Sequence, residues 1–235
     1  LNYELPEIAI YNLLDQKLDI SNILTRVSAD PWLHYCGIIG IYNPKEESSL
    51  KGLLKRINII SMIPENRISI LIPRVLRIII ANRQILFQRY MQSQILTSIS
   101  GSFIIDNDPF DVKTYSNLIA NYLYNSNYID FEHKGMLYIT LLELMINAIE
   151  HGNCRISNSE KTAWINEGKD MMGLIRLKNE DPDINSRKVK FNYTIMEDES
   201  YFRIEDQGSG FDWKSWLKKA KSKKAHLESH GHGIK

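Results

Sequence analysis

The first third of the chain alternates short apolar runs with segments suited to helices. Apolar runs at residues 7–14, 35–42 and 58–63 predict three β-strands. Between them, residues 20–27 suit a helix, and residues 46–57 place leucine and isoleucine at helical spacing. Strands separated by helices of this length pair in parallel. The pattern therefore predicts an α/β part built on a parallel sheet.

A longer helix is predicted from about Pro73 to Leu96. Proline fits the first turn of a helix, where its missing N–H costs nothing. The apolar positions that form its stripe are Leu76, Ile80, Phe87 and Met91. A helix of this length could link two domains, pack against a partner copy, or pack only on its own sheet.

The second half predicts a different arrangement, and Gly101 and Ser102 mark its start. We expect a strand from Phe103, a turn at 106–110 and helices over 111–124 and 131–151, the last ending in a C-cap at Gly152. A weaker helical signal spans 160–177. Residues 188–196 and 201–206 alternate like antiparallel strands joined by a hairpin. The expected domains are residues 1–97 and 98–235.

The amino-acid composition excludes several classes of protein for this chain. The 235 residues are 43% hydrophobic and 24% charged, values typical of a globular chain rather than a disordered or disulfide-rich one. The net charge of +1 does not indicate nucleic acid as a partner. Cys36 and Cys154 lack partners at metal-ligand spacing, so we expect reduced thiols. No stretch reaches about 18 uninterrupted apolar residues and no signal peptide is evident, so we expect a cytoplasmic protein without a membrane partner.

Candidate chemistry begins on the second long helix. Glu143, Asn147 and His151 are four residues apart and would line one helix face, above an apolar underside. An amide oxygen suits Mg²⁺, which takes few protein ligands. A carboxylate one turn earlier can orient water or accept a hydroxyl proton.

Two glycine motifs follow this helix. Asp206, Gly208 and Gly210 come directly after a predicted strand, where the carboxylate could accept a hydrogen bond from an adenine amino group. Glycines there let the backbone approach a base or phosphate closely. Gly231 and Gly233 form a second pair, whose N–H groups could cradle phosphates.

The order of these motifs resembles the GHKL ATP-binding family, closest to the anti-sigma-factor serine kinases. The similarity covers about residues 100–235 and is carried by the segments NAIEHGN and FRIEDQGSGFDW and by the final glycine pair. It implies an α+β two-layer sandwich that binds ATP and Mg²⁺. His232, between the last glycines, departs from the family pattern. The family's last helix and strands would follow Gly233, so we expect a fragment with a half-built phosphate pocket.

The resemblance implies a role for each matching residue. Glu143 would be the catalytic base, Asn147 the Mg²⁺ ligand and His151 a neighbour of the phosphates. Asp206 would hold the adenine amino group, and residues 214–229 would form a lid. The remaining pairs would shape the adenine pocket (Gly208 and Gly210) and the phosphate end (Gly231 and Gly233).

Structural alternatives stay open for several of these residues. Glu143 could be a solvated helix residue, and His151 could cap the helix C-terminus. The lysines of residues 214–229 could be a solvated run rather than phosphate contacts.

The family implies phosphorylation or sequestration of a regulatory partner, either anti-anti-sigma-like or sigma-like, with a homodimer as a further expectation. One alternative is a histidine-kinase catalytic module, but residues 73–96 contain no histidine, and His133 lies in the wrong place for a phosphoacceptor. Another alternative is a protein-interaction module without catalysis.

Residues 1–97 resemble the later part of a response-regulator receiver domain, with its first two βα units missing. The segment PEIAIYN places Asn12 where the family has its phosphoacceptor aspartate, and Ile63-Pro64 stands for the family's Lys-Pro pair. The resemblance implies a degenerate receiver that cannot be phosphorylated and serves as an interaction platform. Strand–helix alternation alone fits many other α/β domains.

Overall fold

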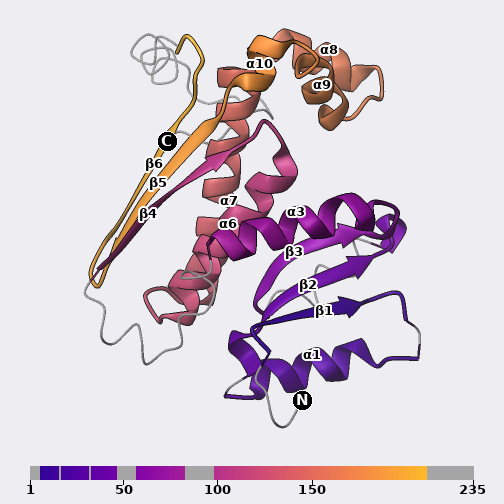
Figure 1. Cartoon of the computed structure of the whole chain (residues 1–235), viewed down its shortest axis with the longest axis vertical. Coiled ribbons are helices and arrows are strands. Elements are labelled where there is room, and N and C mark those ends of the chain that lie inside the picture. The colour runs from indigo at the N-terminus through magenta and orange to yellow at the C-terminus, as the bar shows by residue number, and fades with distance from the viewer. Residues whose placement is uncertain (1–5, 16, 32, 47–56, 83–97, 211–235) are drawn as a thin grey trace, which may run out of the picture. The chain divides into compact units, whose positions relative to one another are not determined.

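The computed structural model describes residues 6–15, 17–31, 33–46, 57–82 and 98–210 and has a mixed α/β fold (Figure 1). These residues form two compact units that interleave along the chain. The first comprises residues up to Ile99, Phe110–Ile139 and Ile195–Ser200, and the second comprises Ser100–Pro109, Thr140–Thr194 and residues from Tyr201 onward. The domain division at 97/98 stays a prediction, and the specific receiver and GHKL folds do too.

The first unit contains the predicted parallel sheet. Its strands β1 (Ile8–Asn12), β2 (Gly37–Tyr42) and β3 (Ile59–Pro64) pair in the order β1-β2-β3. Helix α1 (Ile20–Ala29) connects β1 to β2 and starts at Asp19, whose carboxylate accepts the Asn22 N–H. The prediction of a parallel α/β sheet is confirmed, while most of the helix expected at 46–57 lies outside the described residues.

The core of this sheet forms because its strands are apolar on both faces. Residues Gly37 to Gly40 are all buried, as expected of a strand between two covered faces. Leu24 and Val27 of α1 pack against Ile38 and its neighbours on one of these faces.

Helix α6 (Pro109–Asn125) bonds to the outer strand of the parallel sheet through side-chain amides. The Nδ2 of Asn121 donates to the carbonyl of Ile59 at 2.6 Å, and that of Asn117 donates to the carbonyl of Ile60 at 3.2 Å. Capping an edge strand in this way satisfies backbone acceptors that would otherwise be buried without partners. The predicted helix at 111–124 therefore exists, but it packs on the N-terminal sheet rather than only within the C-terminal half.

Helix α3 (Ile68–Ala81) differs from the helix predicted at 73–96. It begins five residues before Pro73, which lies inside it, and ends where the Asn82 N–H bonds to the carbonyls of Ile78 and Ile79. The buried face carries Leu71, Val75, Ile78 and Ile79. Residues 83–97, with the predicted positions Phe87 and Met91, lie outside the described part of the chain.

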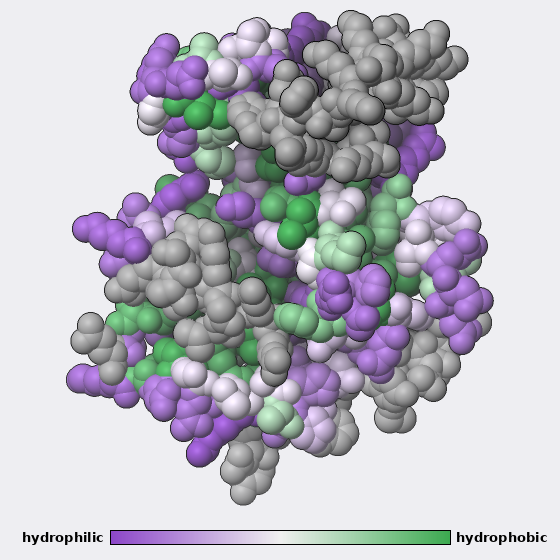
Figure 2. All heavy atoms as spheres, turned by 180° about the vertical axis from the view of Figure 1, so that it is seen from behind, coloured by the Kyte–Doolittle hydropathy of each residue, from purple (hydrophilic) through white to green (hydrophobic). Residues whose placement is uncertain are grey.

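The predicted stripe was also wrong by one position, because Ile80 is 74% exposed whereas Ile79 is 2% exposed. Arg74 on the same helix pairs with Asp111 of α6 at 2.5 Å, which fixes how α3 lies against α6. The sequence alone does not reveal this contact. Hydrophilic and hydrophobic side chains are mixed on the face drawn in Figure 2.

The second sheet is antiparallel, with the order β4-β5-β6. Its strands are β4 (Ser98–Ile105), β5 (Val189–Met196) and β6 (Ser200–Glu205). The two C-terminal strands are confirmed, but β4 starts at Ser98, so Gly101 and Ser102 lie within a strand rather than at a boundary. A side chain at Gly101 would meet the Tyr193 ring, with a built Cβ only 2.7 Å from the ring Cζ, which explains a glycine inside this strand.

One face of this sheet forms the core of the second unit. Phe103, Phe191 and Phe202 stack across the three strands with centroid separations of 5.6 and 6.0 Å. The helices of the C-terminal half are α7 (Phe131–Asn147), a π-helical turn (Ala148–Asn153), α8 (Asn158–Asn166), α9 (Met171–Lys178) and α10 (Pro182–Ser186). The weak helix predicted at 160–177 is thus two helices, separated by a turn in which Gly168 has φ +74°.

Both cysteines are free, as predicted. Both are also buried, and burial raises the pKa of each thiol to about 11. Within the described ranges, no helix combines the length and the apolar character needed to cross a membrane.

The corrected burial of α3 is testable with two neighbouring isoleucines. Ile79→Ala should lower the free energy of unfolding by about 2–5 kcal/mol because it leaves a cavity in the core. Ile80→Ala should change the free energy of unfolding by less than about 0.5 kcal/mol. Urea denaturation followed by circular dichroism measures both, and equal losses would contradict the observed orientation of α3.

Candidate functional site

Helix α7 carries two side chains that are free to meet a ligand. Glu143 is exposed and Asn147 is half-buried, and neither side chain has a partner among the described residues. On the opposite side of the helix, Leu141 and Met145 are fully buried in the core. The helix therefore has an apolar underside, as the sequence predicts, but its exposed side carries Met136 and Ile139 as well as Glu143.

The helix changes its geometry directly after Asn147. The turn that follows is π-helical, and the Cys154 N–H bonds to the carbonyl of Ile149, five residues earlier, at 2.8 Å. A π-turn inserts an extra residue per turn, which breaks the four-residue spacing expected to align His151 with Asn147. Such turns are frequent at functional sites, and here the turn lies between the two candidate motifs.

His151 bonds to the backbone beyond the turn. Its Nδ1 lies 2.6 Å from the carbonyl oxygen of Ile156, and because a carbonyl only accepts, Nδ1 carries the hydrogen. The ring therefore bonds to the chain beyond the turn rather than to a helix carbonyl, so the contact is neither the expected helix cap nor a phosphate contact.

Glu150, within the same turn, is buried and pairs with Lys161 of α8 at 2.5 Å. The pair fastens α8 to the turn and satisfies a carboxylate that would be costly to bury alone. Sequence reasoning missed this pair because its two members are eleven residues apart on different helices.

The turn after β6, from Asp206 to Gly208, lies in close contact with Gly152. A built Cβ at Gly152 would lie 2.6 Å from the Oδ1 of Asp206, and one at Gly208 would lie 2.5 Å from the carbonyl oxygen of Gly152. Neither glycine has positive φ, so both are required for close approach rather than for backbone conformation. Gly152 was expected as a C-cap, but the π-turn runs through it to Asn153.

Gly210 differs from the other two glycines. Its φ is +71° and no atom lies within 4 Å of a built Cβ. It is therefore required for the backbone path leaving the turn, where side chains are strained. Together, Gly152 and Gly208 allow the segment 206–210 to lie directly against the π-turn, and Gly210 allows the backbone conformation at the end of that segment.

The Asp206 carboxylate is held but accessible. Its Oδ1 accepts the Gly208 N–H at 2.8 Å, which forms a local turn of the kind that aspartate favours. The side chain is exposed, and Oδ2 has no partner among the described residues. A ligand that donates a hydrogen bond, such as an amino group, could therefore bind there.

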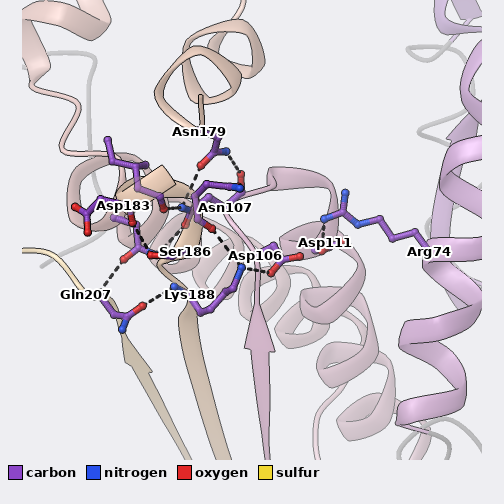
Figure 3. A network of polar contacts seen from close by, with 12 residues as sticks. Arg74, Asp106, Asn107, Asp111, Asn179, Asp183, Ser186, Lys188 and Gln207 are labelled. Atoms are coloured by element: carbon purple, nitrogen blue, oxygen red, sulfur yellow. Dashed lines mark hydrogen bonds and ion pairs between the residues drawn. The ribbon is translucent and has the colours of Figure 1, made fainter. Parts of the chain in front are cut away.

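A partly buried network of polar contacts includes Gln207 of this turn (Figure 3). Asn153 bonds to Gln207 and Asn107, and Asn107 bonds in turn to Asn179 and Ile184. Lys188 adds an ion pair to Asp106 at 2.9 Å. The sequence showed no signal for this network, because its members come from segments far apart along the chain.

Of the candidate residues, Asp206 and Gly208 lie against Gly152, on the turn that follows Asn147, and Glu143 lies one turn before Asn147 on the same helix. Gly231, Gly233 and the expected lid at 214–229 lie outside the described residues. Within the described part of the chain, no three or more His, Cys, Asp and Glu side chains cluster as metal ligands. The free amide of Asn147 fits Mg²⁺ without such a cluster, because this ion keeps most of its waters and takes phosphate oxygens.

No protein-family model, curated protein or solved structure matches the chain. The interpretation of the site therefore depends on the geometry described above.

The close contact between the Asp206 turn and Gly152 can be tested by substituting two glycines, Gly152 after helix α7 and Gly135 within it. Gly152→Ala should destabilise the protein by about 1–3 kcal/mol, since its methyl group would overlap Asp206. Gly135→Ala, on the exposed face of α7 with no atom within 4 Å of its Cβ, should stabilise it by up to about 1 kcal/mol. Chemical denaturation measures the free energy of unfolding of both variants. An unchanged value for Gly152→Ala would show that the Asp206 turn is not in close contact with Gly152.

Proposed function

We propose that the chain binds ATP with Mg²⁺ and acts as a regulatory protein of the anti-sigma-factor serine/threonine kinase type. The observation that supports this most directly is the contact of the Asp206 turn with Gly152. It brings an accessible carboxylate to the end of the helix that carries Asn147 and Glu143. An isolated Asp-x-Gly-x-Gly turn or an isolated polar helix would not provide this arrangement.

In this proposal each free group has one task. Oδ2 of Asp206 accepts a hydrogen bond from the adenine amino group, while Oδ1 stays with Gly208. The amide oxygen of Asn147 binds Mg²⁺, and the ion neutralises phosphate charge when it is bound. Gly208 leaves no side chain between the turn and the helix, so the turn can lie directly against Gly152.

Glu143 is the group best placed for proton transfer. It is exposed on the same helix, one turn before Asn147, and its carboxylate has no partner in the described ranges. A Ser or Thr hydroxyl of a partner protein would attack the γ-phosphate in line and lose its proton to Glu143, while the bond from the γ-phosphorus to the bridging oxygen breaks and ADP leaves. Because phosphoryl transfer requires mainly positioning and charge neutralisation, binding the partner is as important as the chemistry.

The histidine-kinase alternative receives no support from the described residues. Helix α3 contains no histidine. His133 lies at the start of α7, where first its backbone N–H and then its Nδ1, at 2.8 Å, bond to the Asp130 carboxylate and lower the pKa of Asp130. A histidine on the nucleotide-binding helix itself is not a separate phosphoacceptor.

Nucleotide binding tests the first part of the proposal. Asp206→Asn and Asn147→Ala should each weaken the binding of Mg²⁺–ATP by about 10- to 100-fold, as expected when a hydrogen bond to a charged group is lost. Asp198→Asn and Asn166→Ala, which change the same residue types at exposed positions, serve as controls and should bind normally. Isothermal titration calorimetry measures the four affinities, and normal binding by both site variants would remove the assignment.

Phosphoryl transfer tests the second part. Glu143→Gln should keep Mg²⁺–ATP affinity and reduce transfer to a serine-bearing partner by about 10²- to 10⁴-fold, because the general base is lost. Glu132→Gln, exposed on the same helix, is the matched control. Labelled ATP distinguishes the alternatives: label on partner serine supports the kinase, label on histidine of this chain supports the histidine-kinase module, and bound nucleotide without transfer supports a binding module.

A further inference from the structure

Asn153 links four segments of the second unit. It is the last residue of the π-turn, directly after Gly152, and it is completely buried. Its backbone carbonyl accepts a hydrogen bond from Nη1 of Arg187 at 3.0 Å, and its side chain makes two further bonds. A buried amide of this kind is costly unless each of its groups is satisfied, so its arrangement is specific.

The first side-chain hydrogen bond of Asn153 fixes the turn from Asp206 to Gly208. Oδ1 of Asn153 accepts the backbone N–H of Gln207 at 2.8 Å. That N–H belongs to the peptide unit immediately after Asp206, so the bond fixes the backbone from which the Asp206 carboxylate projects. Gln207 is also held through its own Oε1, which accepts the Lys188 N–H at 2.6 Å, but that contact is exposed.

The second bond sets the orientation of the Asn153 amide. Nδ2 of Asn153 donates to Oδ1 of Asn107 at 2.8 Å. Asn107 cannot be reversed, because its Nδ2 donates to the carbonyl of Ile184 at 2.8 Å and a carbonyl only accepts. Asn153 must therefore present its oxygen, and not its NH₂ group, to Gln207.

We propose that Asn153 is a positioning residue that aims Asp206 at the purine and so sets the preference for adenine over guanine, an inference that rests on the proposed function. Adenine carries an amino donor at the position where guanine carries a carbonyl acceptor. A carboxylate held in one place accepts from the first and repels the second, whereas a carboxylate free to move discriminates poorly.

The test compares three variants by two measurements. Asn153→Ala removes both side-chain bonds, and Asn153→Asp keeps the acceptor for Gln207 but loses the donor to Asn107. Asn179→Ala is the matched control, because Asn179 bonds to Asn107 but not to the turn. The measurements are the ratio of ATP to GTP affinity and the hydrogen-exchange rate of the Gln207 amide in the absence of nucleotide.

The ratio of ATP to GTP affinity should fall by about tenfold or more in Asn153→Ala and stay near the wild-type value in Asn153→Asp and Asn179→Ala. The Gln207 amide should lose protection only in Asn153→Ala. Combining Asn153→Ala with Asp206→Asn should lower the ratio no further than Asp206→Asn alone, because Asn153 acts through Asp206. A merely structural role would instead lower both nucleotide affinities alike in every destabilised variant, which would overturn the inference.

Two further outcomes are decisive. If Asn153→Ala does not fold, Asn153→Asp provides the test. A lowered ratio of ATP to GTP affinity with the Gln207 amide still protected would overturn the inference, and a wild-type ratio would support it. If the wild type binds neither nucleotide, the proposed function fails. Hydrogen exchange of the Gln207 amide then tests only whether Asn153 positions the turn. Loss of protection of this amide in Asn153→Ala would support that role, and unchanged protection would overturn it.

Discussion

The structure of the candidate site depends on the contact between Gly152 and the turn from Asp206 to Gly208. Two segments more than fifty residues apart meet there at a distance that no side chain on either glycine would allow. Any larger residue at position 152 would push the turn away from the end of the helix. The carboxylate of Asp206 would then no longer lie against the end of the turn that follows Asn147.

Glycines permit this contact but do not hold it, because the atoms in contact gain little from each other. The buried amides of Asn153 and Asn107 supply the missing directionality. Each bond in the chain from Ile184 to Gln207 fixes the donor and acceptor of the next. A single substitution therefore leaves buried polar groups without partners, which costs more than the bond itself contributes. This makes the position of the turn a property of the whole network.

The sequence predicted the strands and the approach of the two motifs, but not the contacts that position them. Alternation of buried and exposed residues identified β5 and β6 within about one residue, and apolar runs identified the parallel strands. Local rules failed at α3, where Pro73 indicated a start although tertiary packing extends the helix before it. They failed again at Gly101 and Gly152, since glycine as a boundary or cap looks identical in sequence to glycine required by a neighbour. Asn153 gave no signal because its partners lie 46 and 54 residues away.

The two glutamates of the same motif show how burial separates a carboxylate held within the fold from an accessible one. Glu150 is buried and already paired with Lys161, so a substrate could reach its carboxylate only if that pair were broken. Glu143 is exposed, seven residues earlier, and it has no such partner among the described residues. A base must reach its substrate before its pKa matters. If this helix performs catalysis, accessibility therefore favours Glu143 over Glu150, and the buried pair is better understood as the anchor that keeps the π-turn, and with it Gly152 and Asn153, in place.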